Sequence, residues 1–222
     1  MSKRAFQILF IGLLVFVAII VFYQPAKKPP FEQIDRPQAA TPQDGKVEVL
    51  SFFMYHCPYC YQIDAELEAW VSTHKDKVVF KRIPLSFSKN EPETRLFYAL
   101  EASRNEIRMH KKIMQAIHDE GNKFTRDETS VLNWMNQQSE LGGGITQYWH
   151  SAQVIEKTNQ AADIAKRFGV SASPTIIVDG KFVTSPDHLS RSELGNKPGA
   201  LSQTLTLMLE KTRENLKSEV NK

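Results

Sequence analysis

The sequence predicts an α/β fold in which an all-helical insertion separates a βαβ unit from a C-terminal β-hairpin and helix, with a transmembrane helix in front. Three observations predict it. A strand–helix–strand pattern covers residues 47–85, helical periodicity fills most of residues 90–168, and an Asp-Gly pair separates two apolar runs within residues 174–184. Strand, helix and strand within about 40 residues are typical of a βαβ unit with parallel pairing.

The N-terminal segment is the most apolar part of the chain. Residues 5–23 contain one polar side chain, Gln7, and basic residues flank the segment on both sides, so charge does not fix its orientation. A secretory signal has a shorter apolar core, roughly 7–15 residues, and a small-x-small cleavage site, whereas a bilayer span needs about 20 apolar residues. We expect an uncleaved membrane anchor; a cleaved signal and a buried core helix are the alternatives.

The segment that follows is rich in proline, with five between Gln24 and Gly45. This composition favours an extended spacer over a packed element. We therefore expect the folded part to begin near Lys46. The predicted organisation is an anchor (1–24), a Pro-rich linker (25–45), a sheet domain in two pieces (46–89 and 169–217) and a helical insertion (90–168).

Two strands and a helix make up the predicted βαβ unit. Val47–Phe53 is an apolar run of β-forming residues, as expected of a buried strand. Apolar residues then recur at helical spacing from Ile63 to Val71. Lys77–Leu85 is the second strand.

The predicted insertion contains several helices. Thr125 and Glu128 have the spacing of a capping box. A glycine run at residues 142–144 interrupts the periodicity, and a helix over Gln153–Phe168 is expected to end at Gly169, where a C′ glycine belongs.

Strand character returns in the last third of the chain. Pro174–Val178 and Lys181–Thr184 flank Asp179-Gly180. This predicts a hairpin, because a type I′ turn needs positive φ at both central residues. Leu201–Leu216 has the apolar periodicity of a final amphipathic helix.

Composition excludes several function classes. The net charge is +3 with 41% hydrophobic residues, and no basic run with interleaved aromatic residues points to nucleic acid. The sequence has no GxGxxG, Walker A or HExxH motif. We expect no cofactor.

The chemistry is concentrated in the two cysteines of the chain, Cys57 and Cys60. A disulfide between residues so close would close a tiny loop and stabilise the fold very little. A zinc site needs four ligands, and none of the six histidines forms a recognisable ligand pair with another. A structural staple and a metal site are therefore poor explanations, and a reactive pair is the better one.

The local sequence assigns the roles within this pair. Pro58 suits the first position of a helix, which makes Cys57 its N-cap. Free amides and the helix dipole would then stabilise a thiolate on an exposed Cys57, the attacking residue, whereas Cys60 lies one turn into the helix and resolves the mixed disulfide. His56 either adds positive charge near the thiolate or is a solvated residue at the end of the strand.

Three features together resemble the DsbA-like thiol-disulfide oxidoreductases of the thioredoxin superfamily. They are Cys57-Pro-Tyr-Cys60 after an aromatic run, the segment Gly169–Val183, and the helical insertion between them. The similarity covers Lys46–Leu216. It implies a thioredoxin-like fold and a cis Ser173–Pro174 bond beside Cys57, in a loop that binds the substrate backbone by strand addition.

The sequence departs from this family at three positions. The active-site dipeptide is Pro58-Tyr59, where strongly oxidising members have Pro-His. Ser173 replaces a common apolar residue, and Ser51 stands where the family often buries an acid that assists proton transfer. Losing the dipeptide histidine predicts a Cys57 less acidic than in the strongest oxidants, unless His56 compensates.

The leading functional interpretation is an oxidase, held at the inner membrane with its catalytic domain in the periplasm or extracytoplasmic space. It would donate the Cys57–Cys60 disulfide to reduced or unfolded secreted or envelope proteins, and a DsbB-like membrane partner would reoxidise it. A disulfide reductase or isomerase of the same fold, and a tethered peptide-binding chaperone, are the alternatives.

Overall fold

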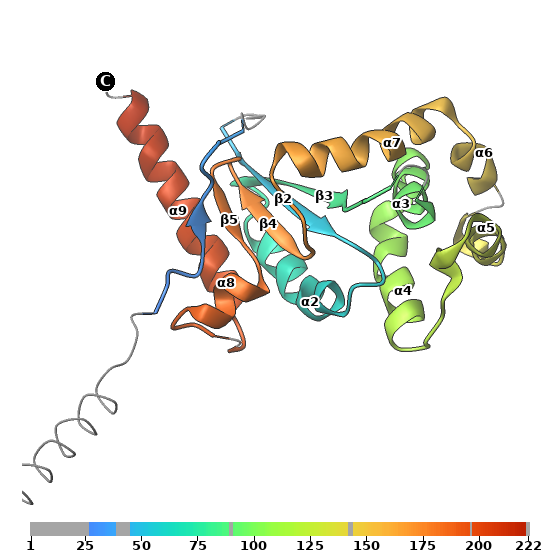
Figure 1. The fold of residues 1–222 in the computed structure, drawn as a ribbon, viewed down its shortest axis with the longest axis horizontal. Helices are drawn as coiled ribbons and strands as arrows, with labels where there is room; N and C mark the ends of the chain where they lie inside the picture. Colours follow the sequence, from blue (N-terminus) through green and yellow to red (C-terminus); the bar gives the residue numbers. More distant parts are fainter. Residues whose placement is uncertain (1–26, 39–44, 89–90, 142–143, 196, 221–222) are drawn as a thin grey trace, which may run out of the picture.

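The computed structural model describes residues 27–38, 45–88, 91–141, 144–195 and 197–220 (Figure 1). Five strands form one mixed sheet in the order β1-β5-β4-β2-β3. Among the strands of the described residues, only β2 and β3 pair in parallel, as expected for the βαβ unit, and the other neighbours are antiparallel. The strands are β1 (Glu32–Gln33), β2 (Val47–Phe53), β3 (Val78–Pro84), β4 (Thr175–Val178) and β5 (Phe182–Thr184).

Helices cover both faces of the sheet. On one face, α2 (Pro58–Thr73) and α9 (Ala200–Val220) pack on Val47 and Val49 of β2, with α8 (Pro186–Arg191) beside them. On the other face, Leu50 and Phe52 pack against the end of α7 (Ala152–Arg167). Because successive residues of a strand point to opposite faces, β2 is buried along its whole length.

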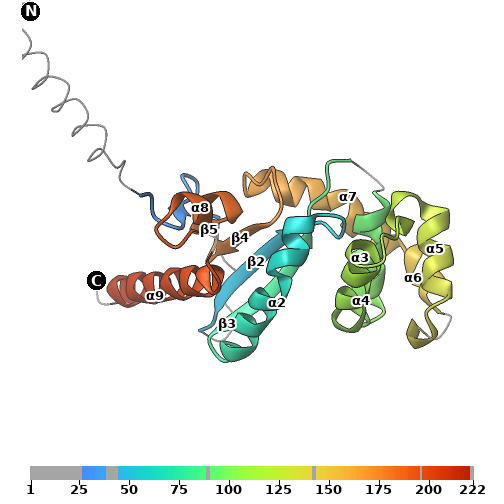
Figure 2. The same cartoon turned by 90° about the horizontal axis from the view of Figure 1, so that it is seen from below.

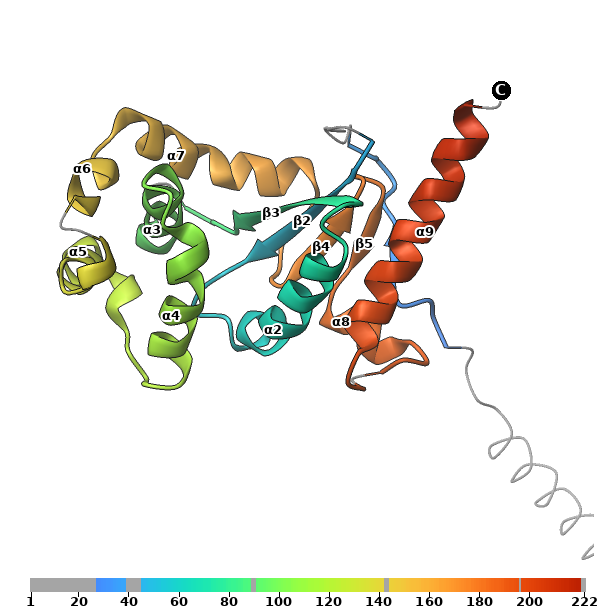
Figure 3. The same ribbon diagram turned by 180° about the vertical axis from the view of Figure 1, so that it is seen from behind.

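The helical insertion lies at one end of the sheet, and α9 lies at the other (Figures 1 and 3). The long helix α7 runs from this block back to the sheet (Figure 2). Phe124 and Trp134 stack in the insertion core with ring centroids 4.1 Å apart, and this core continues as far as Cys57 and Cys60. The other helices of the block are α3 (Pro92–Ala102), α4 (Glu106–His118), α5 (Glu128–Asn136) and α6 (Ile145–Trp149), with 3-10 turns at Phe124–Arg126 and Ser139–Leu141.

Most local expectations are confirmed, and one is wrong. Asp179 and Gly180 have φ of 55° and 61°, as a type I′ turn requires, and Gly169 has φ of 68° after the last turn of α7. The capping box predicted at Thr125 is absent. Asp127 caps α5 instead, accepting a hydrogen bond from the Ser130 amide at 2.9 Å, and Thr125 lies in the preceding 3-10 turn.

The fold begins earlier than the expected boundary at Lys46. Part of the Pro-rich segment forms β1, which pairs with β5 at the edge of the sheet. The segment continues over the hairpin turn, where the Gln38 amide donates to the Gly180 carbonyl at 3.0 Å. A Cβ at Gly180 would collide with the Gln38 carbonyl oxygen, so this glycine is needed for close approach as well as for its positive φ. Residues 27–38 are therefore a strap across the sheet edge, which the linker interpretation missed.

The expected anchor at residues 5–23 lies outside the described part of the chain. In the ranges given above, no helix has both the length and the apolar character needed to cross a bilayer.

Candidate active site

The turn between β2 and α2 places Cys57 at the N-terminus of α2. Cys57 is the N-cap, with φ −81° and ψ 115°, and Pro58 occupies the first turn as the sequence predicted. The Cys57 amide donates to the Met54 carbonyl at 3.2 Å, which fixes the turn. Both cysteines are free thiols. The sequence predicted an exposed Cys57, but its exposed fraction is only 8%, compared with 3% for Cys60.

The two thiols have opposite acid–base properties. The hydrogen bond from the Cys60 thiol lowers the pKa of Cys57 to about 5, despite the opposing effect of burial. Hydrogen bonds from the amides of Tyr59 and Cys60 act in the same direction, as expected at a helix N-terminus. The same Cys60–Cys57 hydrogen bond, together with burial, raises the pKa of Cys60 far above its usual value. At neutral pH the pair therefore holds a thiolate on Cys57 and a proton on Cys60.

The loop before β4 brings Ser173 and Pro174 beside Cys57. The peptide bond between them is cis, as the resemblance implied. Cys57 Sγ lies 3.4 Å from the Ser173 carbonyl oxygen, across 116 residues of sequence. The Ser173 hydroxyl is buried with no hydrogen-bond partner among the described residues. This loop is therefore close enough for a substrate to contact the loop and Cys57 together.

A groove of about 830 Å³ opens beside the pair. Its wall includes Tyr59, which is 60% exposed, and the Ser173–Pro174 loop. The rest of the wall comes from α2 and from the segment around α8, including Ile63, Glu66, Pro186, Leu189, Lys197 and Leu201. The groove size is in the range of small-ligand sites, and its open, mixed lining suits a peptide segment.

His56 is held by a residue that the sequence interpretation missed. Its Nδ1 lies 2.5 Å from Glu93 Oε2, and its backbone amide donates to Glu93 Oε1 at 3.2 Å. The hydrogen bond with Glu93 raises the pKa of His56, more than burial lowers it. Glu93 is 7% exposed in the first turn of α3, and its carboxylate offsets the positive charge that His56 brings near Cys57. No sequence signal marks this contact, because it joins the active-site turn to the insertion.

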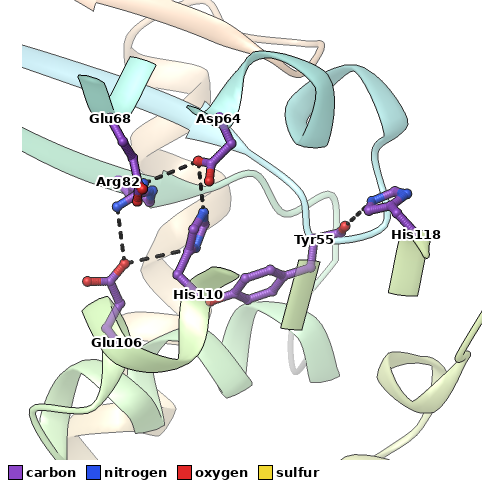
Figure 4. Close-up of polar contacts among 7 residues, drawn as sticks. All are labelled: Tyr55, Asp64, Glu68, Arg82, Glu106, His110 and His118. Carbon is purple, nitrogen blue, oxygen red and sulfur yellow. Dashed lines mark hydrogen bonds and ion pairs between the residues drawn. The ribbon is translucent and has the colours of Figure 1, made fainter. Parts of the chain in front are cut away.

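An ionic cluster next to Cys60 was also not predicted from the sequence. Figure 4 shows its side chains. Arg82 on β3 contacts Asp64 at 3.2 Å and Glu68 at 2.6 Å, both on α2, and Glu106 on α4 at 3.5 Å. His110 on α4 completes the cluster, with Nε2 3.1 Å from Asp64 Oδ1. In the sequence alone, these positions appear only as isolated charges on separate elements.

The register of the sheet places Ser51 beside this cluster. Ser51 on β2 is the direct partner of Arg82 on β3. Since Ser51 carries no charge, the carboxylates around Arg82 come from the helices. Burial lowers the pKa of Arg82, but Asp64, Glu106 and Glu68 outweigh it, so the guanidinium stays charged.

A second histidine of α4 holds the active-site turn from the side. His118 Nε2 lies 2.8 Å from the Tyr55 carbonyl oxygen (Figure 4). Its ring stacks on Tyr61 of α2 with centroids 4.8 Å apart, and the Tyr61 hydroxyl donates to Asp119 at 2.7 Å. The insertion therefore supports both sides of the catalytic turn. Among the described residues, no group of three or more His, Cys, Asp or Glu side chains is arranged to hold a metal ion.

Comparisons with known proteins agree with this geometry. A family model described as Thioredoxin matches residues 42–193. The thiol:disulfide interchange protein DsbA of Burkholderia cepacia is 32% identical over 163 residues, which cover 73% of this chain and 76% of that protein. DsbA of Bordetella parapertussis is 31% identical, covering 64% of this chain and 68% of that protein.

Solved structures show the same fold at lower identity. The oxidoreductase NmDsbA1 from N. meningitidis superposes with a TM-score of 0.73 at 21% identity, covering 86% of this chain and 96% of that chain. Pseudomonas aeruginosa DsbA gives a TM-score of 0.70 at 23% identity, with 85% and 95% covered. The thioredoxin-like α/β fold with a helical insertion is therefore confirmed.

Proposed function

This chain belongs to the DsbA-like thiol:disulfide oxidoreductases of the thioredoxin superfamily, and from that premise we propose that it donates the Cys57–Cys60 disulfide to reduced secreted or envelope proteins. One observation carries the direction of transfer. The pKa of Cys57 is lowered to about 5, and the hydrogen bond with the Cys60 thiol is the largest cause of this shift. Cys60, whose pKa is raised, keeps its proton. A low-pKa thiolate is a good leaving group, so a disulfide that contains it is readily passed on.

The transfer takes two exchange steps. A substrate thiolate attacks Cys57 Sγ of the oxidised pair, the bond to Cys60 breaks, and Cys60 leaves with the electron pair and takes up a proton. A second substrate thiolate then attacks the substrate sulfur of the mixed disulfide, and Cys57 leaves as a thiolate. The substrate loses two electrons and the cysteine pair gains two. Of the two substrate thiol protons, one ends on Cys60 and the other goes to solvent.

Substrate recognition is proposed to use the loop and groove beside Cys57. The Ser173 carbonyl is 3.4 Å from the nucleophile, and backbone groups at this position can bind an extended peptide by strand addition. Exposed Tyr59 and the groove below it would receive neighbouring side chains of the substrate. Contacts of this kind depend little on the sequence of the substrate, which suits an enzyme that donates its disulfide to many different reduced proteins.

We also propose that residues 5–23 anchor the protein to the inner membrane, with the catalytic domain on the extracytoplasmic side. The apolar character of the segment supports this, and oxidising compartments are where protein disulfides form and persist. A DsbB-like membrane protein would then return the reduced pair to its disulfide form. The tether would hold the enzyme where substrates leave the membrane.

The redox state of the pair in the cell tests the direction of transfer. Cells are quenched in acid, free thiols are alkylated, and the masses of the Cys57–Cys60 peptide forms are compared. We expect the pair to be mostly oxidised. A mostly reduced pair would contradict the oxidase proposal and favour the reductase or isomerase alternative.

A further inference from the structure

The reaction needs a proton at Cys60, and the structure limits which groups can supply it. Cys60 is 3% exposed and carries a proton in the reduced pair. It must take up that proton when it leaves the disulfide, and it must lose the proton when the enzyme is reoxidised. Since bulk water reaches this sulfur poorly, the exchanging group has to lie in the protein interior.

A small cavity joins Cys60 to the ionic cluster. Its volume is about 10 Å³, close to what one ordered water needs. Three charged or titratable side chains besides Cys60 line it: Asp64, Arg82 and His110. Asp64 follows Cys60 by four residues on α2, so the two side chains lie on the same face of the helix.

The other charged groups of the cluster are poorly suited to exchange a proton with Cys60. Arg82 keeps its proton at all physiological pH values. Glu68 and Glu106 contact Arg82 but do not line the cavity. Burial raises the pKa of Tyr55 well above its usual value, and its hydroxyl does not line the cavity either.

His110 has the contacts of a proton carrier (Figure 4). It is 1% exposed and faces a carboxylate through each ring nitrogen, with Nε2 3.1 Å from Asp64 and Nδ1 4.0 Å from Glu106. Nδ1 is buried without a hydrogen-bond partner among the described residues. Imidazole exchanges protons near neutral pH more readily than any other side chain.

We propose that Asp64 and His110 form a proton relay for Cys60 through a single water in this cavity. In the donating direction the relay gives a proton to the leaving Cys60 thiolate and is refilled from solvent. During reoxidation it accepts the Cys60 proton as Cys60 Sγ attacks the mixed disulfide at Cys57. The inference rests on the proposed function. It assigns the proton transfer to α2 and the insertion helix α4, because β2 contributes Ser51 and no carboxylate to this cavity.

The second step of oxidation isolates this role. The reduced full-length chain in mild detergent is mixed with glutathione disulfide, quenched in acid and analysed by mass. Formation of the Cys57–glutathione adduct reports the attack by Cys57, and its conversion to the Cys57–Cys60 disulfide reports the attack by Cys60. For Asp64→Asn we expect normal adduct formation and resolution slowed roughly 10²-fold at neutral pH, the lower end of a positioned base's contribution.

A purely electrostatic role of Asp64 predicts the opposite sign. Removing a carboxylate near Cys60 would make its thiolate easier to form and would speed resolution. The relay also predicts that the defect shrinks as pH rises, because hydroxide replaces the missing base. In the wild type, resolution should show a solvent deuterium isotope effect that adduct formation does not share.

Controls separate the possible failures. Lys112 lies on the same helix as His110, and Lys112→Gln removes its exposed ion pair with Glu140; this variant should resolve adducts like the wild type. His110→Gln should slow resolution as Asp64→Asn does; if it does not fold, the wild-type isotope effect and the Asp64→Asn pH profile still decide. Unchanged or faster resolution in Asp64→Asn overturns the relay. A wild type that forms no adduct with glutathione overturns the proposed function itself, and the relay with it.

Discussion

His56 Nδ1 lies 2.5 Å from Glu93 Oε2, which joins the residue next to the nucleophile to the first turn of an insertion helix. Glu93 also accepts a hydrogen bond from the His56 backbone amide, so one carboxylate holds both the ring and the turn. The insertion is therefore part of the active-site architecture. The Glu93 carboxylate therefore offsets part of the positive charge that a protonated His56 brings near Cys57.

This contact predicts a pH-dependent contribution to stability. The pKa of His56 is raised in the folded state by the hydrogen bond with Glu93. Such a group stabilises the fold fully below its unfolded pKa of about 6.5, and the contribution is lost as pH rises through the higher folded pKa. Glu93→Gln should therefore reduce the free energy of unfolding more at pH 5.5 than at pH 9, as measured by denaturant titration.

Glu101→Gln is the matched control for this measurement. It removes an exposed ion pair with Lys157 elsewhere in the insertion, at 2.6 Å. Exposed pairs contribute about 0–1 kcal/mol, so we expect a small effect. A Glu93→Gln effect that is equal at both pH values would show that His56 does not titrate against Glu93.

The acidity of Cys57 is open to direct titration. In the reduced wild type, thiolate absorbance at 240 nm should rise with a midpoint at about pH 5, the lowered pKa of Cys57. Cys60→Ala removes the hydrogen bond that contributes most to this shift, so the midpoint should move toward the ordinary thiol range. An unchanged midpoint would assign the acidity to the remaining contacts of Cys57, with Ser173 and with the amides of Cys60 and Tyr59.

The same shift predicts how the stabilities of the two redox forms diverge with pH. A lowered folded-state pKa contributes stability that is fully present above the unfolded thiol pKa, near 9.0, and is lost as pH falls through about 5. Only the reduced form has this thiolate. The free energy of unfolding of the reduced form should therefore rise relative to that of the oxidised form between pH 5 and pH 9. A constant difference across this window would contradict the assignment.

The sequence was sufficient for features that depend on local rules. Pro58 after Cys57 identified Cys57 as the N-cap, and Asp179-Gly180 identified the hairpin. Each of these depends on the backbone preference of one or two residues. The βαβ pairing also followed from a pattern within about 40 residues.

Contacts between distant segments could not be predicted in this way. Glu93 approaches His56, and His110 approaches Asp64, only because the insertion folds back against the active-site helix. The strap was missed for a related reason. A two-residue strand gives no periodicity, and the prolines around it favour a spacer although β1 pairs with β5.

The strap should contribute measurably to stability. Phe31 packs edge-on against Phe182 of β5, with ring centroids 5.6 Å apart, and lies beside β1. Phe31→Ala should lower the free energy of unfolding by about 1–2 kcal/mol, less than for a fully buried phenylalanine because Phe31 is only partly covered. Phe87→Ala is the matched control, since Phe87 is 64% exposed. Equal effects of the two substitutions would mean that the strap adds no packing energy.

The division of labour between the two thiols predicts which variant traps substrates. Cys60→Ser leaves Cys57 as a nucleophile but removes the thiol that resolves the mixed disulfide. In reduced Cys60→Ser, the Cys57 thiolate should attack disulfides of envelope proteins, releasing one cysteine of each as a thiol and forming long-lived mixed disulfides, seen as reductant-sensitive bands on non-reducing gels. Cys57→Ser should form few or none, because the remaining Cys60 is 3% exposed and its pKa is raised. If Cys60→Ser gave no adducts and Cys57→Ser kept full activity in the cell, the cysteines would be incidental, and the peptide-binding chaperone alternative would explain the groove beside them.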